Sequence, residues 1–241
     1  MRKVFVSMAV LVVMAMPMVA MAEDALGEAK ALLKQETLES SRKALDISLK
    51  VVQQQPKSFE ANWVVAKAYR MTGDESKRAN VPNWKALCKD YGKKGMTYAE
   101  KAVAIDPNKV DGHFWYACSV GTYSDGVSIL TALKEGLKDK TQTGLETSYK
   151  MDKMYNDAGP VLALGRFWSV LPWPLKDKKK AVTYLEEFQK YFPNKPEGQV
   201  YLGAAYLDVK EKDKARAVLT KAAASNDKYY SSMAKDLLND M

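Results

Sequence analysis

The chain has 241 residues but only one histidine and two cysteines, and this scarcity argues against zinc proteases and against hydrolases that depend on histidine. Zinc proteases of the H-E-x-x-H type need two histidines on one helix, and serine or cysteine hydrolases need a histidine beside the nucleophile. His113 has no acidic residue at helical spacing, so we interpret it as a packed or groove-lining side chain. The motifs G-x-x-x-x-G-K-[ST], G-x-G-x-x-G and G-x-S-x-G are also absent. The sequence predicts a protein that is not an enzyme and has no metal site or cofactor.

After residue 22 there is no useful length of the period-two pattern that β-strands show. The long apolar run lies at the start of the chain, where Arg2 and Lys3 precede Val4–Met16 and Ala20-Met21-Ala22 has the small-x-small pattern of a cleavage site. We therefore predict that residues 1–22 are a cleaved signal peptide and that the protein lies in the periplasm without a membrane anchor. The alternative is an uncleaved anchor, for which the run is shorter than the ~20 residues that span a bilayer.

Charge and cysteine content limit the partners further. Removing Arg2 and Lys3 with the signal peptide leaves 35 basic against 29 acidic side chains, and these alternate in sign in runs such as 210–214. Solvated helix faces explain this pattern, so we expect no nucleic-acid partner. Cys88 and Cys118 are compatible with a disulfide in an oxidising compartment, although their spacing in the sequence gives no distance between them.

The clearest internal pattern runs from Gly159 to Ser225, which contains two helix pairs in one register. Leu202, Gly203 and Tyr206 have the L-G-x2-Y spacing of a tetratricopeptide (TPR) first helix, and Ala215, Leu219 and Ala222 follow as the second helix. Leu164, Gly165 and Trp168 repeat that spacing one unit earlier. Small residues at Gly165 and Gly203 are expected to let paired helices approach closely. This pattern predicts a binding surface.

Extending this register upstream predicts an all-α fold, a TPR-like helical-repeat (α-solenoid) array with two insertions and a C-terminal capping helix. We expect residues 23–241 to form one domain, with repeats near 26–56, 59–107, 110–155, 159–193 and 196–225 and a cap at 227–239.

Several element boundaries follow from local signals. Thr72-Gly73-Asp74 predicts a turn after a helix that starts at Phe59, with the partner helix at Gly95–Ile105 and an ordered insertion centred on Asn80–Tyr91. Farther on we expect one helix over Gly126–Leu137 and another over Leu145–Tyr155 with Thr143 as its N-cap. Asn156 to Pro160 predicts a stop and restart.

First helices of stacked repeats line the inner face of a superhelix, and this rule selects candidate contact residues. Aromatic, apolar and basic side chains at these positions suit an extended partner segment or an anionic, partly apolar ligand. The alternative is that the tryptophans belong to the core and the cations are solvated. Trp173 is a further candidate because it lies in a proline-flanked loop, and Trp84 offers apolar surface for homo-oligomers, a further hypothesis. The predicted binding residues are Trp63, Lys67, Arg70, Phe114, Cys118, Leu162, Arg166 and Trp173.

Specific motifs also resemble a known family. Asp157-Ala158-Gly159-Pro160, Leu164-Gly165-Arg166, Pro172-Trp173-Pro174 and His113-Phe114-Trp115-Tyr116-Ala117 look like the T component associated with TRAP transporters (TatT-like), and they resemble more weakly the helical repeats of eukaryotic regulators of microtubule dynamics. The first resemblance implies a periplasmic helical protein that binds the solute-binding protein of a TRAP transporter and shelters an apolar or organic-acid ligand. The chain departs from that family in having no cysteine near the cleavage site.

These observations favour a periplasmic TPR-like adaptor for TRAP-type solute uptake. The runner-up is a general TPR scaffold that binds peptide segments during envelope protein assembly. Neighbouring genes discriminate the two, because a permease and a solute-binding protein would favour the first and assembly machinery the second.

Overall fold

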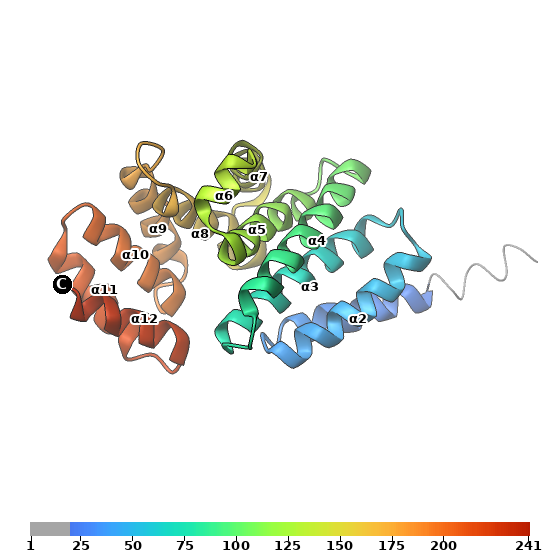
Figure 1. Ribbon diagram of the computed structural model, residues 1–241, viewed down its shortest axis with the longest axis horizontal. Coiled ribbons are helices and arrows are strands. Elements are labelled where there is room, and N and C mark those ends of the chain that lie inside the picture. The colour runs from blue at the N-terminus through green and yellow to red at the C-terminus, as the bar shows by residue number, and fades with distance from the viewer. Residues whose placement is uncertain (1–19) are drawn as a thin grey trace, which may run out of the picture.

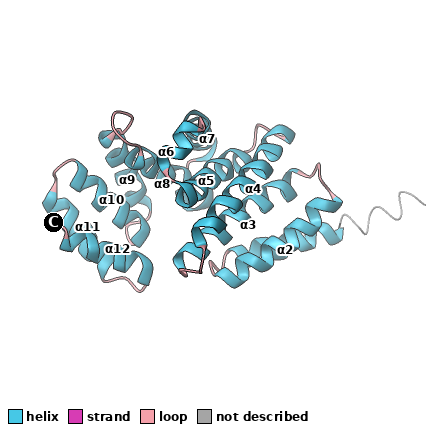
Figure 2. Ribbon diagram, in the orientation of Figure 1, coloured by secondary structure: helices cyan, strands magenta, loops and turns pink. Residues whose placement is uncertain are grey.

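The structure is a computed structural model that describes residues 20–241, and these residues contain helices and loops but no strand (Figure 2). Nearly all of the predicted signal peptide, residues 1–19, lies outside the described residues. The prediction of an all-α, helical-repeat fold is confirmed, and the helices follow one another in a curved array from α2 to α12 (Figure 1).

The N-terminal part contains the longest helices. Residues 20–33 are helical and precede α2 (Leu38–Gln54), α3 (Phe59–Arg78), α4 (Trp84–Ile105) and α5 (Val110–Val127). Thr37 begins α2 with a capping box, and the Ser58 hydroxyl accepts a hydrogen bond from the Ala61 amide at the start of α3. These caps satisfy amides that a helix leaves without partners at its N-terminus. Each helix packs on its neighbour in sequence, and α3 also contacts α5.

The middle of the array departs most from a regular repeat. The short α6 (Ile129–Lys134) follows α5 after Ser128, and α7 (Leu137–Asp152) leads into α8 (Tyr155–Val170). Asn156, Asp157 and Ala158 have positive φ values of 49°, 58° and 54°, so the right-handed helix starts only after them. Pro160 then falls in its first turn, where a missing amide costs no hydrogen bond. The predicted stop and restart lies at this point.

The C-terminal part has the close helix pairs that the L-G-x2-Y spacing predicts. It comprises α9 (Lys178–Tyr191), α10 (Pro196–Asp208), α11 (Lys212–Ala223) and α12 (Lys228–Asn239). A Cβ atom at Gly165 would lie 2.5 Å from Leu185 Cγ, and one at Gly203 would lie 2.5 Å from Leu219 Cγ. Both glycines therefore allow contacts that alanine would obstruct, as expected, and the paired leucines are fully buried.

An ionic and aromatic contact joins the two halves of the array. The Arg78 guanidinium at the end of α3 lies 3.3 Å from the Asp227 carboxylate before α12, and it stacks 4.9 Å from the centre of the Tyr230 ring. The ends of α3 and α12 approach each other at the lower edge of the view (Figure 1). This contact brings residues about 150 positions apart in sequence together across the inner side of the curve.

The turn predicted at Thr72-Gly73-Asp74 is wrong. These residues lie inside α3, where Thr72 is buried and its hydroxyl donates a 2.7 Å hydrogen bond to the Ala68 carbonyl. The partner helix α4 starts at Trp84, well before the predicted Gly95. The extra residues therefore lengthen both helices and do not form a separate insertion, because long paired helices bury more apolar surface than a loop excursion would.

Two further boundaries are corrected. The helix expected over Gly126–Leu137 is interrupted at Ser128, so that Gly126 and Val127 are the last residues of α5 and α6 has only six residues. Thr143 lies within α7 and is not an N-cap, since that position is held by Gly136 with a φ of 73°. Glycine adopts this left-handed conformation at little cost, which threonine does not.

Candidate binding pocket

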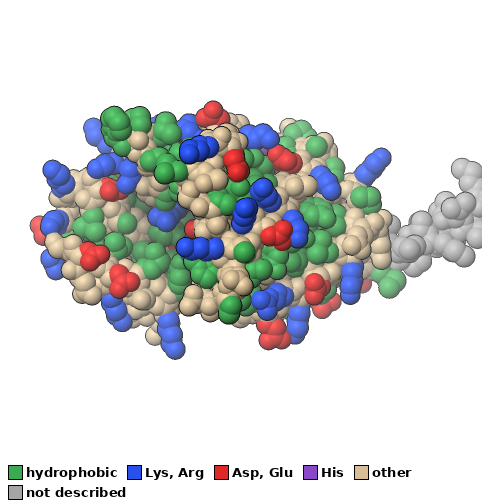
Figure 3. Space-filling model, in the orientation of Figure 1, with side chains coloured by type: hydrophobic (Ala, Val, Ile, Leu, Met, Phe, Trp, Pro, Cys, Tyr) green, Lys and Arg blue, Asp and Glu red, His purple; other side chains and the backbone are tan. Residues whose placement is uncertain are grey.

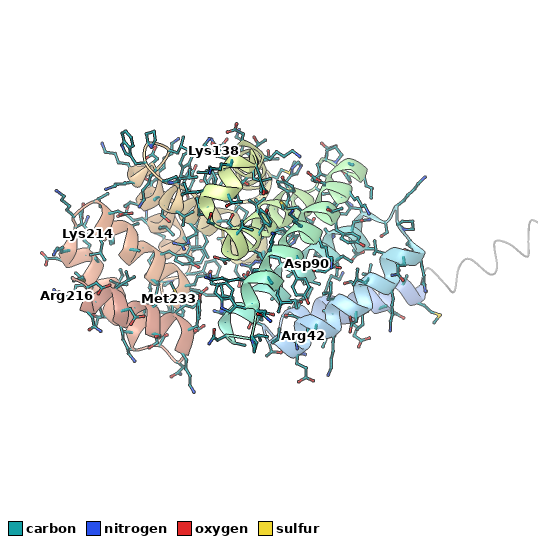
Figure 4. All side chains as sticks on the ribbon, viewed as in Figure 1. Arg42, Asp90, Lys138, Lys214, Arg216 and Met233 are labelled. Carbon is teal, nitrogen blue, oxygen red and sulfur yellow. The ribbon has the colours of Figure 1, made fainter. Side chains whose placement is uncertain are left out.

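The inner side of the curve contains a pocket of about 410 Å³. Its walls come from α3, α5, α8 and α10, the first helices of successive pairs, and from α6 and α7. Lys138 marks the α7 wall in Figure 4. A volume of this size is typical of sites for small organic molecules or for a few side chains of a bound segment.

Aromatic and aliphatic side chains form the floor of the pocket. Phe114 is 3% exposed and packs edge-on against Trp115 and Tyr155, with ring centres 4.9 and 5.4 Å away. The Cβ that Gly159 lacks would lie 2.6 Å from the Phe114 ring, so the glycine makes room for this aromatic group. The remaining apolar lining includes Val120, Leu133, Leu145, Leu162, Ala163, Phe167 and Val170.

The left-handed turn of residues 156–158, near the start of α8, borders the pocket and is fixed from both sides. Lys67 Nζ donates a 3.3 Å hydrogen bond to Asn156 Oδ1, and Lys195 Nζ lies 3.1 Å from Asp157 Oδ2. Three consecutive non-glycine residues with positive φ are strained by about 1 kcal/mol or more each. Strained backbone of this kind gathers at functional sites, and here it directs Asn156 and Asp157 into the pocket lining.

Charged side chains surround the pocket entrance in mostly paired form. Arg70 Nη2 lies 2.7 Å from Asp74 Oδ2, and Lys77 Nζ lies 2.8 Å from Asp125 Oδ1. Arg166 is exposed and its guanidinium lies 4.7 Å above the centre of the Tyr201 ring. Lysine and arginine side chains are scattered over the face drawn in Figure 3 with acidic ones between them. The pocket thus has an apolar floor and a polar entrance in which Arg166 is free to meet an anionic group.

Burial sets the protonation of the groups near the floor. Burial lowers the pKa of Lys67, whose ammonium lies 4.9 Å from the centre of the Trp115 ring. Burial raises the pKa of the Cys118 thiol to about 12, and it raises that of Tyr155 above its ordinary value, with further contributions from Asp111. The thiol and the phenol are therefore neutral at physiological pH. Neither is an activated nucleophile, so the pocket is chemically equipped for binding.

The structure brings most of the predicted binding residues together. Arg70, Phe114, Cys118, Leu162 and Arg166 all line the pocket, and Lys67 holds its border at Asn156.

Trp63 and Trp173 lie elsewhere. Trp63 packs between the hydrophobic clusters of the N-terminal helices, as the alternative interpretation holds. Trp173 is 90% exposed in the loop between α8 and α9.

Cys88 and Cys118 are free thiols, so the disulfide is not formed. Cys88 is buried and donates a 3.3 Å hydrogen bond to the Gly73 carbonyl, which directs it toward α3, whereas Cys118 lines the pocket.

Sequence reasoning missed the contributions of α6, α7 and α10. The predicted binding residues do not include Leu133, Lys138 and Leu145, because the helix boundaries expected around Gly126 and Thr143 are wrong. The predictions also do not include Tyr201 and Glu197 of α10, because the last first-helix residue predicted to bind is Arg166 in the preceding pair. The repeat register itself could have found Tyr201, since it lies on a first helix whose inner side faces the pocket.

The described part of the chain has neither a metal-binding cluster nor a membrane-spanning helix. Residues 20–241 contain no group of three or more histidine, cysteine, aspartate or glutamate side chains placed to hold a metal ion. In the same range no helix combines the length and the apolar character needed to cross a membrane.

The fold is that of a TPR-type helical-repeat protein, with a pocket on the concave side. The family described as Regulator of microtubule dynamics protein 1-3 matches residues 25–167, more than half of the chain, and the chain belongs to this family. No curated protein matches the sequence.

Solved structures support the fold over nearly the whole chain. A thermophilic TPR protein of Thermus thermophilus, TTC0263, superimposes with a TM-score of 0.64 at 16% identity, covering 90% of this chain and 99% of the other. The MamA protein superimposes with a TM-score of 0.52 at 14% identity, covering 83% and 89%. At these identities the likeness concerns the fold. TPR-like folds generally mediate protein–protein interactions, which fits a concave face of this kind.

Proposed function

We propose that the protein is a non-enzymatic adaptor that binds a partner in the concave pocket. The observation that carries this proposal is the pocket itself, with its floor of Phe114, Leu162 and Phe167 below the exposed Arg166. An apolar floor contributes affinity through burial, and a guanidinium at the entrance selects for a carboxylate or another anion.

The specific context that we propose is TRAP-type solute uptake in the periplasm. The partner is then the solute-binding protein of the transporter, and the pocket receives a partly apolar organic acid or an acidic segment of that partner. The resemblance of the motifs at Asp157–Pro160, Leu164–Arg166 and Pro172–Pro174 supports this context, and so does a pocket that combines apolar and cationic groups.

Affinity capture from periplasm tests the proposal. Wild-type protein is expected to retain a solute-binding protein, and Arg166→Glu is expected to lose it because the reversed charge repels the anionic group. Arg42→Glu is the matched control, since Arg42 is exposed on α2 outside the pocket (Figure 4). Equal capture by all three proteins, or capture of no solute-binding protein, contradicts the TRAP context.

A general scaffold that binds peptide segments during envelope assembly is the second candidate. The likeness to a TPR protein supports it, because curved helical repeats present extended concave surfaces that can bind partners. In this case the same capture would return assembly factors, still lost in Arg166→Glu and kept in Arg42→Glu.

The location is a separate part of the proposal. Protein recovered from a periplasmic fraction is expected to begin at Glu23, since the predicted cleavage follows Ala22. An N-terminal sequence that begins at Met1, or recovery in the cytoplasmic fraction alone, contradicts periplasmic export.

A further inference from the structure

The loop between α8 and α9 exposes an apolar tip that the pocket does not use. Trp173 is 90% exposed and Leu175 is 40% exposed, and prolines flank the tryptophan on both sides. Hydrophobic side chains gather at this corner of the molecule, with lysine and arginine side chains beside them (Figure 3). Tryptophan side chains are highly buried on average, so one that is this exposed beside a second apolar side chain is a candidate contact site.

Hydrogen bonds hold the loop in one shape. The amides of Leu175 and Lys176 both donate to the Pro172 carbonyl, at 2.8 and 3.1 Å. Lys176 also pairs with the Asp208 carboxylate, and Lys178 Nζ donates a 2.8 Å hydrogen bond to the Asp208 carbonyl. The loop is therefore fixed to α10, and its tip is presented with little conformational entropy left to lose on binding.

Lysines follow the apolar tip directly. Lys178, Lys179 and Lys180 occupy the first turn of α9, are all exposed, and have no acidic residue among them in that turn. Asp177 lies 3.9 Å from Lys180, and Asp208 is occupied by Lys176, so Lys178 and Lys179 carry the excess positive charge. The first turn of a helix usually carries acidic residues, because its free amides make it positive. An anionic surface beside this turn relieves the repulsion.

We propose that this corner is a peripheral membrane-binding site for an anionic bilayer surface. Tryptophan partitions into the interfacial region with its ring among the headgroups, and neighbouring lysines extend their ammonium groups to anionic lipids. A projecting apolar tip next to exposed cations matches a bilayer surface, which needs no complementary cavity. An acidic protein partner would need a pocket shaped for Trp173, and it is treated as an outcome of the test.

This site does not depend on the pocket. It provides a way to concentrate the chain at a membrane although no helix within residues 20–241 can cross one. A protein held at the surface through one corner keeps its concave face open to partners.

Vesicle flotation with the purified protein tests the site. We expect binding to phosphatidylcholine vesicles that contain about one third phosphatidylglycerol, weak binding to phosphatidylcholine alone, and release at high salt. Trp173→Ala is expected to lower the partition coefficient by roughly tenfold or more through the lost burial of the ring. The variant Lys179→Glu, which leaves the hydrogen bond from Lys178 to Asp208 in place, is expected to lower it by about fivefold or more.

The control variants make the same kinds of substitution at positions outside this corner. Leu130→Ala removes an exposed apolar side chain on α6, and Lys50→Glu reverses an exposed charge on α2. Both are expected to bind vesicles as the wild type does, and so is Arg166→Glu, which separates this site from the pocket. Thermal melting checks that each variant is folded.

Two results overturn the proposal. The first is absence of binding to the anionic vesicles, or equal binding by Trp173→Ala and the wild type. The second is an acidic protein captured from periplasm through Trp173 and Lys179 while vesicles are not bound, which assigns the corner to a protein partner.

Discussion

Glu187 shows how one partly buried carboxylate joins two repeats. Tyr149 Oη donates to it at 3.0 Å and Lys153 Nζ lies 3.0 Å from it, so α9 is tied to α7 across α8. Burial of Glu187 raises its pKa, but hydrogen bonds from Lys153 and Tyr149 outweigh burial and hold the pKa below its ordinary value of 4.5. The contacts therefore favour the ionised form.

Replacing this carboxylate is expected to destabilise the protein in a pH-dependent way. Glu187→Gln should lower the free energy of unfolding by about 1 kcal/mol at neutral pH, because the charged acceptor is lost. A depressed pKa contributes stability above 4.5 that is lost as the pH falls through the lower folded-state value, so the two proteins should converge in acid. Urea unfolding at several pH values measures the difference.

The matched control is Glu39→Gln. Glu39 pairs with Lys43 on the exposed side of α2, with a side chain 80% exposed. Such pairs contribute little, and this variant should unfold as the wild type does. An equal loss in both variants, or a Glu187→Gln effect that persists below about pH 3, contradicts the assigned role of Glu187.

At the residue scale, the sequence predicts the pocket residues that lie on the first helix of each pair. The repeat register alone predicts Arg70, Phe114 and Arg166, and they meet in the pocket because that register places them on the inner side of α3, α5 and α8. Trp63 was selected by the same rule and is packed between helices instead. The repeat register predicts on which face of a helix a residue lies. The long α3 and α4, however, cover side chains that the shorter helices of a regular repeat would leave exposed.

At the scale of the helices, the C-terminal pairs depend on close packing at glycine positions. Gly203 of α10 faces Leu219 of α11, and a Cβ at this position would lie 2.5 Å from Leu219 Cγ. Gly203→Val is therefore expected to lower the free energy of unfolding by about 1–3 kcal/mol or more, since either α11 or the leucine must move.

A second glycine provides the control for this prediction. Gly27 lies in helical residues 20–33 with nothing within 4 Å of the position of a Cβ. Gly27→Ala is expected to stabilise the protein by about 0.5–1 kcal/mol, because alanine loses less backbone entropy in a helix. Thermal denaturation of both variants gives the comparison, and a destabilisation of equal size in both would show that packing against Leu219 is not the cause.

Element boundaries were the least predictable part of the fold. Thr72, Gly73 and Asp74 are residues that turns favour, yet they continue α3, where the Thr72 hydroxyl donates to the Ala68 carbonyl and Asp74 pairs with Arg70. The position of Asp74 also depends on α5, since the Thr122 hydroxyl donates a 2.9 Å hydrogen bond to the Asp74 carboxylate. Local composition does not contain that information, and tertiary packing decides the boundary.

At the scale of the whole molecule, the Arg78 contact joins the end of α3 to the start of α12. Arg78→Ala removes the pairing with Asp227 and the stacking on Tyr230. The first turn of α12 is then expected to open more readily, by about 1 kcal/mol or roughly fivefold in amide exchange rate. Hydrogen exchange followed by mass spectrometry measures this effect. Arg42→Ala is the control, and unchanged exchange in α12 of Arg78→Ala would show that the contact does not hold the ends together.

The central claim is that the concave face meets the partner, and site-specific photocrosslinking in cells tests it most directly. A photoreactive amino acid is placed at Leu162 on the pocket floor and, in a second protein, at Arg216 on the outer edge of α11 (Figure 4). We predict a discrete protein adduct from position 162, absent in the Arg166→Glu background, and none from position 216. An adduct from position 216 alone, or adducts that do not depend on Arg166, would contradict the account.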